Sequence, residues 1–406
     1  MAFIRPFRAL RPRPDLAARI AAVPYDVVNR AEARALAHGN PHSFLHVSRA
    51  DIDLPDTVAA EADAVYTRAW ETFEAFRSSF LIEDPLSRLY VYRLTMGEHV
   101  QTGVAGAFSL QEYRDNRILK HETTRKAKED DRTRHITELR AQTGPVLLTY
   151  VRSPHVDSVI ASVTARPPLY DFVADDGVAH TVWQADEAET AGLVEGFAGV
   201  PSLFIADGHH RAASAARASD ALGAGPEDEA AFFLAVAFPD VQMRILPYHR
   251  VVKDLHGQTV EAFLTALSQR LPVEAGSAEP ARQGECAMYI KGRWYRLRLD
   301  GDEATVEGQG DPTASLDAAR LSRKVLGPLL GIEDLRTDPR IDFVGGIRGS
   351  EALATLVDQG EAAVAFAMYP VSVGEVMAIA EAGGVMPPKS TWFEPKLRDG
   401  LLSREI

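Results

Sequence analysis

The chain has little of several features that would narrow its function at once. Its 406 residues include one cysteine, Cys286. That count excludes an internal disulfide and a cysteine-based zinc site, and it suits a reducing cytoplasm. No window approaches 18 consecutive apolar residues, so we expect no membrane partner. The first 14 residues carry four arginines and three prolines but no long apolar stretch, which argues against a secretory signal.

Basic charge and the common phosphate-binding motifs are scarce as well. Lysine and arginine number 44 against 57 aspartates and glutamates, which gives a net charge of −13. A chain with this balance repels a polyanion, so we expect no nucleic-acid partner. A Walker-type loop, a protein-kinase signature set and the histidine spacing of preformed zinc sites are all missing. These absences exclude the commonest kinase folds and leave other phosphate chemistry open.

The composition that remains is that of a globular protein. Hydrophobic residues make up 46% and charged residues 25% of the chain, and its length predicts two or three domains. Helical periodicity over 56–80 and 128–142, with hairpin signals over 88–108 and 169–183, predicts a mixed α/β (α+β) fold. Because the pattern restarts near residue 253, we expect two α/β domains. They span 1–252 and 253–406, and we expect the last segment, 385–406, to pack back toward the functional site in the first domain.

The most informative stretch is 201–219, an apolar run that breaks at Asp207-Gly208 and continues into an alanine-rich run. It predicts a buried strand that turns into a helix N-terminus, where unpaired N–H groups and the helix dipole attract anions. Gly208 permits a sharp turn, and Arg211 offers a fork for phosphate oxygens. A capped helix would explain Asp207 and Gly208, but it does not require the sequence His-His-Arg that follows. Phosphate chemistry is the leading hypothesis, with contacts from Asp207, Gly208, His209, His210 and Arg211.

Two further stretches offer groups for proton transfer. His121 and Glu122 lie beside two threonines with basic residues on either side, a pattern that suits proton transfer or polyphosphate binding. The alternative interpretation of this stretch is a solvated charged face that leads into a helix. A turn that opens with Pro24 would present Tyr25 and Asp26, although plain structure explains that stretch equally well.

The stretch Met386–Leu397 contains three prolines, which stiffen its backbone. A stiff segment carrying Lys389 and Ser390 suggests a phosphate contact in addition to a docking role. The structural alternative is that Trp392 and Phe393 fix this segment against the core, and the two interpretations are compatible.

Five stretches together resemble domain-of-unknown-function family 1015, nearly from end to end. They are Ile4-Arg5-Pro6-Phe7, Pro24-Tyr25-Asp26-Val27, His121-Glu122-Thr123, Asp207-Gly208-His209-His210-Arg211 and Met386-Pro387-Pro388-Lys389-Ser390-Thr391-Trp392-Phe393. That family lends little settled function of its own.

The stretch 207–211 is also similar to the ParB and sulfiredoxin superfamily, in which a glycine-containing turn before a helix holds nucleotide phosphates. The similarity implies a ParB/sulfiredoxin-like core with additional mixed-sheet and helical elements. The superfamily includes free-serine kinases with a comparable Asp-Gly-His-(His or Thr)-Arg turn, which phosphorylate L-serine with ATP or ADP and magnesium. The resemblance therefore implies a glutamate base and phosphate contact by Gly208, His209, His210 and Arg211.

A small-molecule kinase is physically coherent, since phosphoryl transfer needs positioning and charge neutralisation more than covalent chemistry. We expect ATP or ADP as donor, Mg²⁺ held by Asp207, and a small hydroxyl-bearing metabolite, most simply L-serine, as acceptor. Glu122, His121 and Asp26 are the candidate catalytic residues, and choosing Glu122 over Asp26 as base is arbitrary. Lys389 and Ser390 join the phosphate contacts. We expect a cytoplasmic protein whose oligomeric state is open, with a homodimer among the options.

Two other classes remain. A metal-dependent phosphohydrolase would use the carboxylates and imidazoles of the two central stretches, His121, Glu122, Asp207, His209 and His210. A nucleotide-binding regulator of the ParB type would bind nucleotide without turnover.

Overall fold

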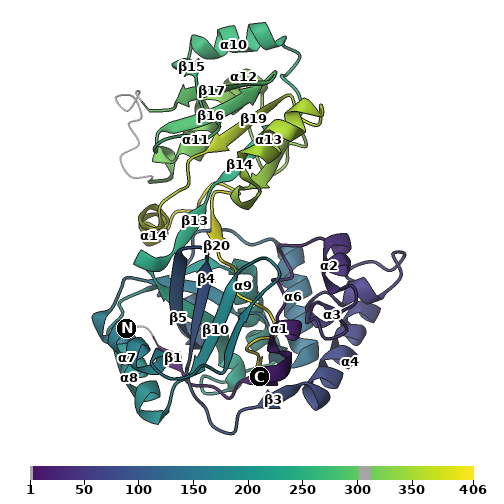
Figure 1. Cartoon of the computed structure of the whole chain (residues 1–406), viewed down its shortest axis with the longest axis vertical. Helices are drawn as coiled ribbons and strands as arrows, with labels where there is room; N and C mark the ends of the chain where they lie inside the picture. The colour runs from purple at the N-terminus through teal and green to yellow at the C-terminus, as the bar shows by residue number, and fades with distance from the viewer. Residues whose placement is uncertain (1–2, 301–311) are drawn as a thin grey trace. The chain divides into compact units, whose positions relative to one another are not determined.

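The computed structural model describes residues 3–300 and 312–406. Contacts between Cα atoms divide the chain into two units: unit 1 contains 1–243 and 395–406, and unit 2 contains 244–394 (Figure 1). The sequence placed the division near residue 253. Unit 2 begins before that residue, at residue 244. Strand β14 (Tyr248–Val252) belongs to it, because this strand pairs with β18 (Ile341–Gly345) on one side and β19 (Val364–Met368) on the other, inside the sheet of unit 2.

Unit 1 is built on a mixed sheet, which confirms the α/β class. Strand β12 pairs in parallel with β8 and antiparallel with β5, and β1 (Ile4–Arg5) adds to β5. The strand order is β6 (Ile118–Leu119), β11 (Leu203–Asp207), β8 (Val146–Tyr150), β12 (Phe232–Pro239), β5 (His99–Ser109), β4 (Tyr90–Met96), β10 (Ala179–Gln184) and β9 (Tyr170–Val173). The hairpin expected over 169–183 is β9–β10, which turns at Gly177 with a left-handed φ of 80°.

Helices α7 (Pro154–Thr164), α8 (Glu187–Ala198) and α9 (His209–Ala221) supply apolar residues to the main core of unit 1. That core includes Phe108, Leu148, Phe197 and Ile205, each with at most 1% of its surface exposed. Burying a side chain of this size contributes about 1.5–3 kcal/mol. The core therefore fixes the carboxyl end of β11 and the start of α9, which is where the candidate site lies.

A second, smaller core in unit 1 gathers the helices α2 (Arg30–Ala37), α3 (Leu45–Ser48) and α4 (Asp63–Ser79) around Phe44 and Phe73. Helix α4 begins later than the expected residue 56, because the preceding residues form turns and Asp56 pairs with Arg34 at 3.0 Å. Helix α6 (Lys126–Leu139) packs against both α4 and α9. Helix α6 ends at Leu139, before the expected residue 142. Arg140, the residue that follows the helix, takes a left-handed φ of 52°.

Residues 395–406 complete unit 1 after the chain has passed through unit 2. Asp399 exchanges backbone hydrogen bonds with Ala22, and β21 (Arg404–Glu405) pairs with β7 (Ala141–Gln142). The Arg398 side chain reaches His180 at 3.1 Å and also contacts Asp176. The yellow segment among the purple and teal elements of unit 1 in Figure 1 is this return.

Unit 2 is a smaller antiparallel sheet covered by helices. Its strand order is β15 (Val273–Ala275), β17 (Arg293–Arg298), β16 (Glu285–Ile290), β19, β14 and β18. A separate antiparallel pair, β13 (Arg244–Leu246) with β20 (Trp392–Glu394), contains the first and the last residues of the unit. Its helices are α10 (Val260–Ser268), α11 (Asp317–Leu321), α12 (Gly327–Leu330), α13 (Gly349–Asp358) and α14 (Val373–Glu381). Among the residues described in both units, none of the helices has the length and apolar character that crossing a membrane requires.

Candidate functional site

The turn from β11 to α9 has the form that the sequence predicts. Leu203, Phe204 and Ile205 are buried, and the chain reverses at Gly208, whose φ of 94° is left-handed. A Cβ at this position would stand 3.0 Å from the guanidinium of Arg211, so glycine is required by both backbone and space. Among the residues that the structure describes, no side chain caps the start of α9. The positive end of the helix dipole therefore lies at this turn, although Gly208 and His209 are buried.

His209, the first helical residue, packs against His121. The two rings lie 4.5 Å apart in an edge-to-face arrangement, and His209 Nε2 accepts the backbone N–H of His121 at 3.4 Å. That contact places the proton of a neutral ring on Nδ1, which lies 3.8 Å from a carboxylate oxygen of Glu122. Burial lowers the pKa of His121 to about 4 and the pKa of His209 well below its usual value. Both rings are therefore neutral at pH 7 and are not cations for phosphate.

His210, the next residue, is half-buried and connects two helices. Its Nε2 accepts the backbone N–H of Arg125 at 3.0 Å, immediately before α6. Burial lowers the pKa of His210, although Asp26 and Glu129 act in the opposite direction. This ring therefore fixes the start of α6 beside the start of α9.

Arg211 lies inside the protein and not at its surface. With 7% of its surface exposed, it donates from Nη2 to Asp207 at 2.8 Å and from Nη1 to the carbonyl of Pro145. Asp26 lies 4.0 Å from the same guanidinium. Burial alone would lower the pKa of Arg211, but Asp26, Asp207 and Asp399 raise it above its usual value. The guanidinium is committed to acceptors of the protein itself, and its role as a phosphate fork stays a prediction.

Asp207 pairs with a second cation, Lys396, from the segment that follows unit 2. Lys396 Nζ lies 3.5 Å from Asp207 Oδ1, while Oδ2 faces Arg211. Burial raises the pKa of Asp207, and the two cations outweigh that effect and hold it below its usual range. Asp207 is therefore ionised and neutralised within the protein.

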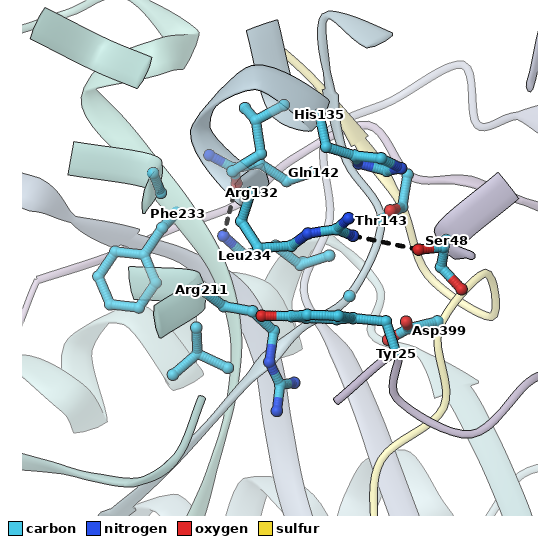
Figure 2. A pocket seen from close by; sticks show the side chains of 14 residues that line it. Tyr25, Ser48, Arg132, His135, Gln142, Thr143, Arg211, Phe233, Leu234 and Asp399 are labelled. Carbon is cyan, nitrogen blue, oxygen red and sulfur yellow. Dashed lines mark hydrogen bonds between the residues drawn. The ribbon is translucent and has the colours of Figure 1, made fainter. Parts of the chain in front are cut away.

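A cavity of about 40 Å³ lies behind this turn and is lined by Tyr25, Arg132, Arg211 and Asp399. Figure 2 shows the Arg132 guanidinium above the Tyr25 ring, at 4.2 Å from the ring centroid, with its hydrogen bond to the Ser48 carbonyl. Three polar atoms of the lining have no hydrogen-bond partner within the described residues: Ser48 Oγ, Arg211 Nε and Asp399 Oδ1. A polar cavity of this size has room for ordered water.

Asp399 brings an unusual carboxyl group to that cavity. It is 2% exposed, and burial raises its pKa to about 7, with Asp26 adding to the shift and Arg211 and Arg132 opposing it. The group therefore changes charge near neutral pH, inside the protein and close to the arginine that anchors the turn.

A larger pocket of about 290 Å³ shares Tyr25, Ser48, Arg132 and His135 with the small cavity. Asp26 lines this pocket with 33% of its side chain exposed, and Glu122 is not among the residues that line it. Lys128 and Tyr66 form other parts of the wall. The volume and the mixed polar and apolar lining suit a small metabolite.

The structure brings together most of the site residues that the sequence suggested. His121, Glu122, Asp26 and the stretch 207–211 gather within unit 1. Lys389 and Ser390 belong to unit 2, where Lys389 Nζ lies 3.3 Å from the Tyr248 hydroxyl and Ser390 donates to the Pro387 carbonyl. Their part in phosphate binding stays a prediction.

Magnesium does not fit the ligand that the sequence suggested. Both oxygens of Asp207 already face cations, and a hard divalent ion needs oxygens that are free to approach it. Within 3–300 and 312–406, no group of three or more His, Cys, Asp or Glu side chains is placed to hold a metal ion. The ion stays a prediction.

Sequence reasoning missed several residues of the site. Lys396 and Asp399 follow unit 2, whereas Arg132 lies in α6 and Ser48 in α3. Lys396 stood within the proline-rich stretch and could have been found there. Nothing in the sequence around Asp399 marks it.

The protein is therefore a mixed α/β protein in which a glycine turn precedes the uncapped start of α9. A small cavity lies behind this turn, and a metabolite-sized pocket shares part of the cavity's lining. The family model "Protein of unknown function (DUF1015)" matches residues 4–319, and the chain belongs to this family, as its motifs suggested. Lys396 and Asp399 lie outside the matched residues. No curated protein matches the chain in sequence.

Several solved structures are similar to this chain at low identity. A conserved hypothetical protein from Pyrococcus furiosus is 16% identical, with a TM-score of 0.34, over 75% of this chain and 94% of that one. A free serine kinase in complex with AMP is 15% identical, with a TM-score of 0.34, over 73% and 91%. SbnI from Staphylococcus aureus, truncated at its C-terminus, is 14% identical, with a TM-score of 0.38, over 73% and 86%. Likeness at these values says nothing about the activity of this chain.

Proposed function

We propose that this protein is a nucleotide-dependent kinase that transfers a phosphoryl group from ATP or ADP to the hydroxyl of a small metabolite, most simply free L-serine. The observation that carries the proposal is the uncapped start of α9 behind Gly208, together with the 290 Å³ pocket lined by Asp26. Arg211 relates the two, since it is part of the turn and lies 4.0 Å from Asp26. The proposal assigns the donor phosphates to the start of α9 and the acceptor hydroxyl to the pocket.

The donor end uses the backbone more than the side chains. The first amide groups of α9 would bind phosphate oxygens, because they have no cap and carry the positive end of the dipole. Lys396, held beside Asp207, adds a cation close to that position. The turn is rigid, since Gly208, Asp207 and Arg211 are fixed by one another, and a rigid arrangement of donors is what phosphoryl transfer requires.

The acceptor end favours Asp26 over Glu122 as the general base. Asp26 lines the pocket, whereas Glu122, with 48% of its side chain exposed, lies beside His209 and outside the pocket lining. A base must reach the hydroxyl whose proton it accepts. Glu122 and His121 would then orient the His209 ring, since both contact it.

The proposal is tested by incubating the purified full chain with ATP or ADP, magnesium and L-serine, L-threonine or L-homoserine. We expect a phosphorylated amino acid, detected by mass spectrometry and phosphorus NMR. No phosphorylated product with any hydroxyl compound would overturn the proposal. Phosphate release without an acceptor would identify a phosphohydrolase instead. Nucleotide binding without turnover would identify a regulator.

The base is tested by comparing Asp26→Asn with Glu122→Gln. We expect Asp26→Asn to lower kcat by about 10²–10⁴ while nucleotide affinity is kept, because only proton transfer is removed. Glu122→Gln should have a smaller effect. Asp175→Asn, an exposed aspartate of the β9–β10 turn, is the matched control and should behave as the parent protein. Equal turnover in Asp26→Asn and the control would exclude Asp26 as the base.

A further inference from the structure

Helix α6 presents two cations to the 290 Å³ pocket of unit 1. Lys128 and Arg132 both line the pocket and lie four residues apart in α6. Residues at this spacing are neighbours on a helix surface, with Cβ atoms about 5–6 Å apart. His135, one turn further along, adds no charge, because burial lowers its pKa. The cations on this side of the pocket are therefore Lys128 and Arg132.

Arg132 is fixed in place and keeps a donor free. Its Nε donates to Asp131 at 2.8 Å and its Nη1 to the Ser48 carbonyl at 3.1 Å, while Nη2 donates to no group of the described residues. The Tyr25 ring, 4.2 Å from the guanidinium, supports it from below in Figure 2. Asp131 is itself held by the Tyr66 hydroxyl at 2.8 Å. A guanidinium that is already ordered binds a carboxylate at a low cost in side-chain entropy.

Ser48 brings a neutral donor to the same part of the wall. Its side chain is buried, and its Oγ has no hydrogen-bond partner within the described part of the chain. Ser48 lines the pocket together with Arg132, and its own carbonyl group holds Nη1 of that arginine. A buried hydroxyl without a partner costs free energy, which a ligand oxygen would recover.

The charges of the pocket leave Lys128 unmatched. Lys128 is exposed and forms no ion pair among the described residues, whereas Lys126 of the same helix pairs with Asp130 at 2.8 Å. Asp51, on another wall of the pocket, is bound to Arg49 through two contacts of 3.0 Å. A cation without a partner beside a guanidinium with a free N–H attracts a small anion.

We propose that Lys128, Arg132 and Ser48 bind a carboxylate of the acceptor, so that the protein selects hydroxy acids over alcohols that lack a carboxylate. This inference rests on the proposed kinase function, in which the hydroxyl of the same molecule faces Asp26. Asp26 follows Tyr25, whose ring contacts Arg132, so the hydroxyl and carboxylate positions are neighbours in the pocket. The three residues determine specificity and take no part in proton transfer.

The test is titration calorimetry of the intact chain with three probes. L-serine has both a carboxylate and an ammonium group, ethanolamine lacks the carboxylate, and glycolate lacks the ammonium group. We expect saturable binding of L-serine and glycolate, and an affinity for ethanolamine that is about 10-fold or more below that for L-serine, since charge-assisted hydrogen bonds are lost.

Variants assign the difference to the pocket. In Lys128→Gln the affinity for L-serine and glycolate should fall by about 5-fold or more, and in Ser48→Ala by about 3-fold or more, while ethanolamine binds as before. Lys126→Gln, which removes the same charge from the same helix outside the pocket lining, is the matched control and should leave all three affinities unchanged.

Four outcomes would overturn the inference. They are no saturable binding of any probe, ethanolamine bound as tightly as L-serine, and equal affinities for L-serine in Lys128→Gln and Lys126→Gln. The fourth is a fall in ADP affinity in Lys128→Gln with L-serine unaffected, which would assign Lys128 to the nucleotide.

The inference and the proposed function can fail separately. If L-serine binding depends on Lys128 and the kinase assay yields no phosphorylated product, the carboxylate site stands and the kinase is excluded. If ethanolamine is phosphorylated as readily as L-serine, the kinase stands and the carboxylate site is excluded.

Discussion

Arg211 in unit 1 and Arg250 in unit 2 are both buried arginines, yet their surroundings differ in charge. Arg211 contacts Asp207 at 2.8 Å and lies 4.0 Å from Asp26, and these carboxylates raise its pKa. Arg250 has carbonyl groups as its acceptors, and burial lowers its pKa to about 10. Each is buried beside a left-handed residue, Gly208 in one case and Lys389 in the other.

The difference separates a buried arginine whose charge is matched by carboxylates from one whose charge is met by carbonyl groups alone. A charge matched inside the protein contributes to a rigid turn, and removing it leaves unpaired carboxylates. A buried charge without a carboxylate partner costs free energy in the folded protein. The two arginines should therefore respond in opposite ways to the same substitution.

The largest effect is expected from Arg211→Met. It would leave Asp207, Asp26 and Asp399 without a shared cation, so we expect a loss of about 3–5 kcal/mol in the free energy of unfolding at pH 7. Urea unfolding measures this loss. Arg217→Met, on the exposed side of the same helix α9, is the control and should cost about 1 kcal/mol or less. A loss for Arg211→Met no larger than the control's would show that the network is not structural.

The second effect concerns Asp399, whose pKa is raised by burial from 3.8 to about 7. The folded chain holds this proton in a pH range where the unfolded chain has released it. Stability from this group therefore falls as the pH rises from about 4 to about 7. Asp399→Asn should be more stable than the parent protein at pH 8, by no more than about 4 kcal/mol, and nearly equal to it at pH 4. Thermal unfolding of the variant and the parent protein at pH 4 and pH 8 measures this difference. If Asp399→Asn were more stable by the same amount at pH 4 and at pH 8, the titration of the Asp399 carboxyl group would not be the cause of the gain.

A smaller effect is expected from Gly208→Ala, which introduces a Cβ at a left-handed position 3.0 Å from the Arg211 guanidinium. We expect a loss of about 1–2 kcal/mol from the backbone, with a further cost from displacing Arg211. Gly223→Ala, after the end of the same helix, has a left-handed φ and nothing within 4 Å of its added Cβ. The difference between the two variants in urea unfolding isolates the contact with Arg211, and no difference would exclude it.

The smallest change in stability is expected from Arg250→Met. The unfolding free energy should stay within about 1 kcal/mol of the parent value or rise, because an unmatched buried charge is removed. A loss as large as that of Arg211→Met would show that Arg250 is structural and would remove the contrast between the units.

Much of the fold could be predicted from local patterns. The strand, glycine turn and helix over 201–219 follow from an apolar run, a residue that accepts positive φ and an alanine-rich segment. Small buried residues such as Ala212 and Ala215 let α9 pack closely on its neighbours. Their number does not predict that Arg211 is buried, since Arg217 of the same helix keeps 38% of its side chain exposed.

The rest of the site depends on contacts between distant parts of the chain. Asp399 meets Arg211 because residues 395–406 return to unit 1, and no local periodicity encodes that return. The preference for Asp26 over Glu122 rests on which of them lines the pocket. That Arg250 forms no ion pair with a carboxylate, among the residues that the structure describes, is visible only in three dimensions. Sequence patterns predict elements well and charge pairing poorly, since a pair depends on tertiary packing.

The return of residues 395–406 has a consequence for how the protein is made. The ribosome emits all of unit 2 before it emits Lys396, Asp399 and Arg404, which are bound inside unit 1. The first 243 residues must therefore wait, partly folded, with the positions of these three side chains unfilled. Synthesis of unit 2 sets the length of that wait, so slow codons there would lengthen the time during which the nascent chain depends on chaperones.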